Sequence, residues 1–177
     1  MVIFGATGDL THRKPVPAIY NTARDGDLPA GVQILGFARR DKSDGEFRAG
    51  LEELNRKVSR TGHDEAIWSS FVGNIHYHRS EFGDADGYQR LAERLDEIDR
   101  ERGGKGNRLF YIASAPEFFD DILDHLKTAG LNECRKGCWS RVIVEKPFGT
   151  DLATAQHLNE VVSRTFDSYS KKEIRTI

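Results

Sequence analysis

The sequence predicts an α/β fold with a doubly wound, mostly parallel sheet flanked by helices. Short apolar runs alternate with segments whose apolar residues recur at helical spacing, and this alternation is typical of βαβ units. Several of the runs are continuously apolar, as expected for strands that are covered on both faces. A glycine-containing turn follows the first run, and such a turn is typical of nucleotide-binding α/β folds. The 177 residues are enough for one domain with a full core.

The predicted strands are short and spread along the whole chain. They cover residues 2–4, 32–38, 75–78, 109–113 and 141–145. Apolar residues at helical spacing follow in the segments 47–58, 88–98 and 119–126, and each set is expected to bury one helical face. Asp151 is the predicted start of the last helix, because a carboxylate caps the first backbone N–H groups of a helix.

Charge and hydropathy exclude two classes of partner. With 26 basic and 28 acidic residues and a net charge of −2, nothing indicates a nucleic-acid surface or an anionic membrane partner. There is no apolar stretch of membrane-spanning length and no charged-then-apolar leader. We therefore expect a cytoplasmic protein that binds small molecules.

The first candidate site is the turn Gly5-Ala6-Thr7-Gly8-Asp9-Leu10, between the apolar run 2–4 and a helical stretch. Glycine has no Cβ, so the backbone can turn sharply and its N–H groups can approach a pyrophosphate at the positive end of the next helix. The G-x-x-G spacing is tighter than the usual G-x-G-x-x-G, and an ordinary turn fits it nearly as well. The turn alone is therefore a weak indication of a dinucleotide.

Basic residues follow the second and the fifth predicted strands, and ligands of such sheets lie beyond the carboxyl ends of the strands. Arg39 and Arg40 stand where an NAD enzyme places a carboxylate and an NADP enzyme an arginine, so they favour NADP. The alternative is a solvated turn that Asp41 partly neutralises. Lys146, held in direction by Pro147, is placed to hold a substrate hydroxyl near a nicotinamide; the alternative is a surface lysine in a proline turn.

Metal binding has weaker support. His76 and His78 share one face of a predicted strand, but a metal site there needs a third ligand that the nearby sequence does not supply. Cys134 and Cys138 lie four residues apart, and a zinc site would need two more ligands. We expect no metal site, and reduced thiols at both cysteines.

Four segments, in chain order and at these separations, closely resemble the N-terminal coenzyme domain of the glucose-6-phosphate dehydrogenase family. Residues 5–14, GATGDLTHRK, resemble its G-A-S-G-D-L-x-x-R/K-K fingerprint, with Thr7 at the usual serine. Residues 36–39, GFAR, resemble its G-Y/x-A-R, and residues 141–149, RVIVEKPFG, its R-I-I-V-E-K-P-F-G. Residues 109–113, LFYIA, resemble its L-F-Y-L-A. The resemblance covers residues 2 to about 166.

The resemblance implies a Rossmann-type domain over residues 1–166 and a non-matching, frayed tail over residues 167–177. In the family, hydride passes from C1 of glucose 6-phosphate to NADP, giving 6-phosphogluconolactone and NADPH in the pentose phosphate pathway. The implied partners are this coenzyme and a sugar phosphate, and full-length relatives are expected to be homo-oligomers. Arg39, with Arg40 beside it, would bind the 2′-phosphate, and Lys146 would contact the substrate near the nicotinamide. The residues implied to bind the pyrophosphate and neighbouring groups are Gly5, Ala6, Thr7, Gly8, Asp9, Leu10, Thr11 and His12.

Several positions depart from the family pattern. Ala115 stands at the first of two usual prolines, and Phe119 where a tyrosine near the coenzyme is common. The segment R-I-D-H-Y-L-G-K, which supplies substrate-phosphate ligands in the family, should follow Phe166, and residues 167–177 do not match it. The family's later general-base histidine is not matched either, and oxidation of an alcohol needs a base. We therefore expect a fragment that binds NADP, lacks the substrate domain and does not oxidise the sugar phosphate alone.

Two other functions fit part of the sequence. Other NAD(P)-dependent sugar and diol dehydrogenases also place E-K-P after their fifth strand, but they usually open with G-x-G-x-x-G. A non-catalytic NADP-binding or assembly module, completed by another chain, would account for the missing base. Activity measured with and without a candidate partner would distinguish these alternatives.

Overall fold

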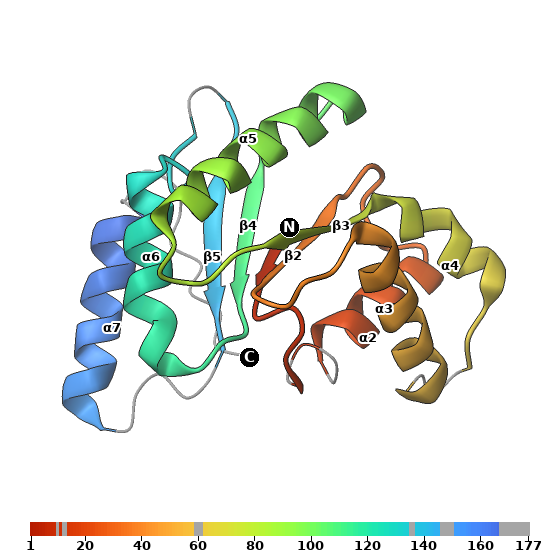
Figure 1. Ribbon diagram of the computed structural model, residues 1–177, viewed down its shortest axis with the longest axis horizontal. Coiled ribbons are helices and arrows are strands. Elements are labelled where there is room, and N and C mark those ends of the chain that lie inside the picture. Colours follow the sequence, from red (N-terminus) through yellow and green to blue (C-terminus); the bar gives the residue numbers. More distant parts are fainter. Residues whose placement is uncertain (10, 12–13, 59–61, 135–136, 146–150, 167–177) are drawn as a thin grey trace.

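A five-stranded parallel sheet forms the centre of the molecule (Figure 1). The computed structural model describes residues 1–9, 11, 14–58, 62–134, 137–145 and 151–166. The strand order is β3-β2-β1-β4-β5, and every neighbouring pair is parallel. All five predicted strands are confirmed, with ends that shift by one or two residues. They are β1 (Val2–Phe4), β2 (Ile34–Ala38), β3 (Ile75–Arg79), β4 (Arg108–Ile112) and β5 (Ser140–Val144).

Helices cover both faces of the sheet. In Figure 1, α5, α6 and α7 lie on one side and α2, α3 and α4 on the other. The predicted helical faces at 47–58, 88–98 and 119–126 are confirmed as parts of α3, α5 and α6, and α4 was not predicted. None of the described helices is long and apolar enough to cross a membrane. The bounds are α2 (Pro15–Arg24), α3 (Asp44–Val58), α4 (Glu65–Phe71), α5 (Ala85–Arg102), α6 (Phe119–Thr128) and α7 (Leu152–Thr165), with short 3₁₀ helices at Val72–Asn74 and Pro116–Phe118.

Capping residues set where two of these helices begin. The Asp151 carboxylate accepts a hydrogen bond from the Thr154 backbone N–H at 2.8 Å, which confirms Asp151 as the start of α7. Asp64 caps α4 in the same way, accepting from the N–H groups of Ala66 and Ile67. The helix α4 has only seven residues, too few to show a helical repeat, which is why the spacing pattern did not indicate it.

The sheet separates two hydrophobic cores, and its short strands face both. In β1, Val2 and Phe4 belong to the core beneath α5, α6 and α7, whereas Ile3 belongs to the core beneath α2, α3 and α4. Successive side chains of a strand point to opposite faces, so a strand covered on both sides needs an apolar residue at every position. The continuous apolar runs in the sequence follow from this arrangement.

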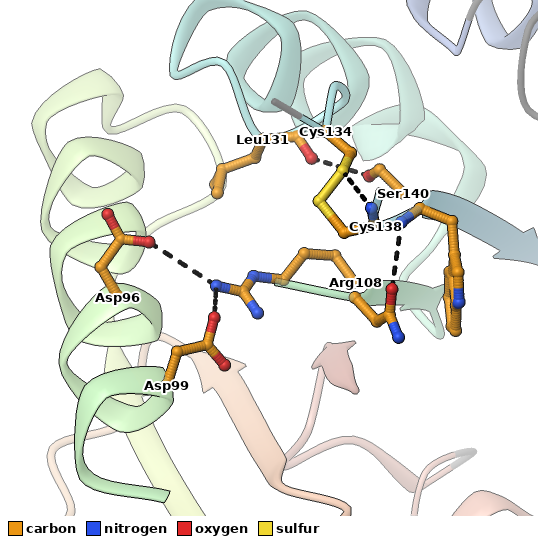
Figure 2. Close-up of a disulfide and its surroundings, with 9 residues drawn as sticks. Asp96, Asp99, Arg108, Leu131, Cys134, Cys138 and Ser140 are labelled. Carbon is orange, nitrogen blue, oxygen red and sulfur yellow. Dashed lines mark hydrogen bonds and ion pairs between the residues drawn. A yellow bond between two sulfur atoms is a disulfide. The ribbon is translucent and has the colours of Figure 1, made fainter. Parts of the chain in front are cut away.

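Cys134 and Cys138 are joined by a disulfide (Figure 2), so the expectation of reduced thiols was wrong for this structure. Gly137 has a positive φ of 68°, and the turn brings the two Cα atoms to 5.5 Å, a separation that suits a disulfide. The bridge precedes Ser140, the first residue of β5. It therefore lies at the amino ends of the strands. The expected frayed tail over residues 167–177 falls outside the described residues.

Candidate functional site

A cleft of about 380 Å³ opens at the carboxyl ends of four strands. The chain order reverses between β1 and β4, which are neighbours in the sheet although β2 and β3 come between them in the sequence. Such a reversal leaves a crevice where ligands of open α/β sheets bind. The cleft is lined by Gly5, Thr7 and Gly8 after β1, Ala38 to Arg40 around the end of β2, Ser80 to Gly83 after β3, and Ala113 to Ala115, Phe118 and Asp121 after β4.

Among the described residues, four hydrogen bonds hold the turn after β1. The N–H groups of Gly5 and Ala6 both donate to the Phe37 carbonyl of β2, at 3.0 and 3.2 Å. The Gly5 carbonyl accepts from the Gly8 N–H at 2.8 Å and from the Thr11 hydroxyl at 2.9 Å. The turn is therefore tied both to the neighbouring strand and to the segment that follows it.

Glycine at position 5 is required by backbone angle and by space. Its φ is +80°, a region that L residues rarely adopt. A Cβ there would lie 2.7 Å from the Ala113 carbonyl oxygen, on the turn after β4. Only glycine lets the turns after β1 and β4 approach this closely and form one wall of the cleft.

The predicted turn residues divide by their position. Gly5, Thr7 and Gly8 line the cleft. Ala6 and Thr11 are fully buried, so their side chains support the turn and do not face the cleft. Asp9 is exposed and outside the lining set. Leu10 and His12 lie outside the described residues.

Arg39 and Arg40 lie together in the turn after β2, exposed and on the wall of the cleft. The Asp41 carboxylate lies 3.4 Å from Arg79 Nη1 and forms its ion pair there. Within the described part of the chain, neither Arg39 nor Arg40 forms an ion pair. The cleft thus presents two guanidinium groups, whose planar donors suit a phosphate dianion, along with the carboxylates of Glu81 and Asp121.

Two aromatic rings, which the sequence patterns did not single out, give the cleft an apolar wall. Phe82 and Phe118 line it, with ring centroids 5.1 Å apart. Phe119, at the position where the family commonly has a tyrosine, is only 3% exposed and packs in the core. The rule that ligands lie beyond strand ends would have indicated Phe82, which follows β3 closely. Phe118 could not be distinguished from Phe119 until the helix orientation was known.

A buried carboxylate lies at the carboxyl end of β5. Glu145 is 7% exposed and accepts a hydrogen bond from the Tyr111 hydroxyl, and its Oε2 lies 3.6 Å from Lys14 Nζ. Burial, with the nearby carboxylate as a second cause, raises the pKa of Tyr111 far above its ordinary value, so the phenol stays a donor. Lys146, the next residue after Glu145, lies outside the described residues.

The two histidines considered for metal binding have separate partners. His76 Nε2 lies 3.0 Å from the Gln33 side-chain oxygen, and His78 Nε2 lies 2.9 Å from the Gly87 carbonyl. Each imidazole thus has its own hydrogen-bond partner at Nε2.

Another group of possible metal ligands comprises Glu52, His63 and Glu65, whose ligand atoms lie within 4.8 Å of one another. Arg56 Nη2 already donates to both carboxylates, at 2.6 and 2.9 Å. The group is therefore an ion-pair network, and its residues are not among those that line the cleft.

Comparisons with known proteins agree with this geometry. The family model described as glucose-6-phosphate dehydrogenase, NAD binding domain, matches residues 2–171. The glucose-6-phosphate 1-dehydrogenase of Chlamydia muridarum is 42% identical over 177 residues, covering 96% of this chain and 34% of that protein.

Two solved structures share the fold. A glucose-6-phosphate dehydrogenase in complex with its substrate glucose-6-phosphate has a TM-score of 0.83 at 32% identity, covering 99% of this chain and 35% of that one. The glucose-6-phosphate 1-dehydrogenase of Mycobacterium avium has a TM-score of 0.79 at 30% identity, covering 94% of this chain and 34% of that one. The chain spans about a third of the length of the relatives it matches. It therefore belongs to the glucose-6-phosphate dehydrogenase family, in which it corresponds to the NAD-binding domain.

Proposed function

We propose that the chain binds NADP in the cleft at the carboxyl ends of β1 to β4, as the coenzyme domain for oxidation of glucose 6-phosphate. One observation favours NADP as the coenzyme. Arg39 and Arg40 line the same cleft as the glycine turn, and neither has an ion-pair partner among the described residues. An unesterified ribose hydroxyl needs no such charge, whereas a 2′-phosphate is a dianion.

The residues of the cleft fit the adenosine and pyrophosphate part of a dinucleotide. Gly5 lets the turn after β1 lie against the turn after β4, and three N–H groups of the turn after β1 are used within the protein. Thr7 also lines the cleft, and we assign its N–H and hydroxyl to the pyrophosphate. Phe82 and Phe118 offer an apolar surface for a flat base. When bound, the coenzyme supplies the hydride acceptor.

Lys146 is proposed to contact the substrate. Support comes from the residue before it, since the buried Glu145 is held by Tyr111 and by Lys14. A cation directly after a residue held in this way is a suitable ligand for a sugar hydroxyl or phosphate. The relatives named glucose-6-phosphate 1-dehydrogenase support this substrate class.

The general base is the component we do not assign within the described residues. His63, His76, His78, His125 and His157 are all described, and none of them lines the cleft. The proposal is therefore that this chain supplies coenzyme binding, and that oxidation of the sugar needs further residues such as those in the longer relatives. We also propose a cytoplasmic location, because a relative at 34% identity from Arabidopsis thaliana carries the word cytoplasmic in its name.

Titration with NADP and NAD tests the proposal. Calorimetric titration of the purified chain is expected to give a lower Kd for NADP than for NAD. Arg39→Ala should raise the Kd for NADP by about 10- to 100-fold, the loss of a hydrogen-bonded charge, while changing the Kd for NAD much less. Arg164→Ala, on α7 and paired with Asp124 at 3.1 Å, is the matched control and should change neither.

Two results would contradict the proposal. If Arg39→Ala raised the Kd values for NAD and NADP equally, the assignment of Arg39 to the 2′-phosphate would be wrong. Formation of NADPH that depends on glucose 6-phosphate, by the purified chain alone, would show that the chain itself contains a working base.

A further inference from the structure

A buried hydroxyl reaches the turn that carries Arg39 and Arg40, whose Ala38 carbonyl also accepts a hydrogen bond from the Ser80 backbone N–H at 3.1 Å. Tyr77, in the middle of β3, donates from its hydroxyl to the Arg40 carbonyl at 2.6 Å, and the same oxygen lies 3.2 Å from the Ala38 carbonyl. These two carbonyls belong to the residues on either side of Arg39. The Tyr77 hydroxyl therefore contacts the backbone on both sides of Arg39, the first of the two arginines.

The Tyr77 ring is itself held in place. Its side chain is 8% exposed, and its ring packs against Phe47 of α3 with centroids 4.9 Å apart. Its backbone N–H donates to the Asp44 carboxylate at 2.7 Å, where α3 begins. Burial raises the pKa of the Tyr77 hydroxyl above its ordinary value, so it remains a proton donor at neutral pH.

The side chains of the turn have no comparable support. Arg39 and Arg40 are exposed, and among the described residues no carboxylate holds either guanidinium group. Long basic side chains lose conformational entropy when they bind an anion, and a backbone that is already fixed reduces that cost. The orientation of this turn before ligand arrives thus depends on the Tyr77 hydroxyl.

We propose that Tyr77 is a positioning residue for coenzyme selection: its hydroxyl holds the Arg39–Arg40 turn in the conformation that receives the 2′-phosphate. This inference rests on the proposed binding of NADP in the cleft. Tyr77 itself touches no part of the coenzyme in this scheme and acts only through the backbone of the turn. Neither the sequence motifs nor the family comparison assigns it this role.

The test compares Tyr77→Phe with the wild-type chain in binding three ligands: NADP, NAD and adenosine 2′-phosphate, which carries the 2′-phosphate without a pyrophosphate. The variant removes one oxygen atom and keeps the ring. The Kd values for NADP and adenosine 2′-phosphate are expected to rise about three- to tenfold, the range that one net hydrogen bond supplies, while the Kd for NAD stays within about twofold.

Tyr20→Phe is the matched control. The Tyr20 hydroxyl is also buried and accepts a backbone hydrogen bond from Asp64 at 2.7 Å, but Tyr20 does not line the cleft. Both variants should lower thermal stability by similar amounts, and only Tyr77→Phe should change ligand selection. If Tyr77 had a purely structural role, Tyr77→Phe would raise the Kd values for NADP and NAD equally or change neither. Either result overturns the inference.

The outcomes also separate this inference from the proposed function. If the wild-type chain does not prefer NADP to NAD, the proposed function fails and the inference fails with it. If the wild type prefers NADP and Tyr77→Phe keeps that preference, only the role of Tyr77 is refuted.

Should Tyr77→Phe not fold, the backbone order parameters of the wild-type chain without ligand decide, because they report how rigidly the turn is held. The order parameters of residues 39–41 are then expected to exceed those of the exposed loop 104–107, and equal values would overturn the inference.

Discussion

Replacing Gly5 with alanine should destabilise the chain through two separate effects. At φ +80° an alanine costs about 1–2 kcal/mol of backbone strain. The new Cβ would also lie 2.7 Å from the Ala113 carbonyl oxygen and 3.1 Å from its carbon. Because these are backbone atoms, they can yield only if the turn after β4 moves, and such overpacking costs about 1–3 kcal/mol. The sum is about 2–5 kcal/mol, a fall in Tm of roughly 4–20 °C for a domain of this size.

Gly26→Ala separates the two effects. Gly26 has almost the same φ, +79°, but no heavy atom lies within 4 Å of the place that a Cβ would occupy there. Both variants therefore have the same backbone strain and the same change in unfolded-state entropy. The difference between their free energies of unfolding measures the cost of the contact between the Gly5 and Ala113 turns. Urea unfolding at constant m-value, followed by circular dichroism, gives the two free energies of unfolding.

Gly5→Ala should be the less stable variant by about 1–3 kcal/mol, and it should also raise the Kd for NADP, whereas Gly26→Ala should leave that Kd unchanged. If the two variants are equally stable, the contact with Ala113 does not constrain the turn. The reasoning about the shared wall of the cleft would then be refuted.

Three further predictions concern the turn, the buried histidines and the sheet edge. Thr11→Val should remove the hydrogen bond to Gly5 and raise the Kd for NADP about three- to tenfold. Thr11→Ser keeps a hydroxyl and should retain the wild-type Kd. An equal rise in Kd for both variants would show that the hydroxyl does not support binding. Burial lowers the pKa values of His76 and His78 below the ordinary 6.5, so the unfolded chain takes up protons first and stability should be lost as pH falls below 6.5. Urea midpoints of the wild type should fall more steeply over that range than those of a His76→Gln, His78→Gln variant, and parallel pH profiles would contradict this. Finally, no described strand pairs with the outer edge of β5, so light scattering should detect self-association at high concentration; a persistent monomer would count against it.

Much of the fold could be predicted from local patterns. The five strands and the faces of α3, α5 and α6 follow from apolar periodicity, which reflects burial on one or two sides. The helix α4 escaped prediction because its seven residues offer less than the repeat that such a pattern needs. The disulfide was wrongly expected to be a pair of thiols, since composition says nothing of the turn at Gly137 that brings the cysteines together.

The candidate site divides in a similar way. Gly5, Arg39 and Arg40 could be identified because each follows a predicted strand, and strand ends of a parallel sheet meet at one edge. Phe118 could not be distinguished from its neighbour Phe119, because which of the two faces the cleft depends on how the following helix packs. Tyr77 lies between two histidines in the sequence, and no local pattern indicates that its hydroxyl reaches the turn after β2.

The sequence by itself determined the order of the strands and of the helices other than α4, the glycine turn, the basic residues after β2 and the family resemblance. These are local properties, set by backbone freedom, side-chain chemistry and the period of apolar residues. Only the tertiary structure decided that Ala6 and Thr11 support the turn while Thr7 faces the cleft, and that Asp41 is drawn to Arg79. It did so because these outcomes depend on contacts between segments that are far apart in the chain, and no local pattern records which partner lies across such a contact.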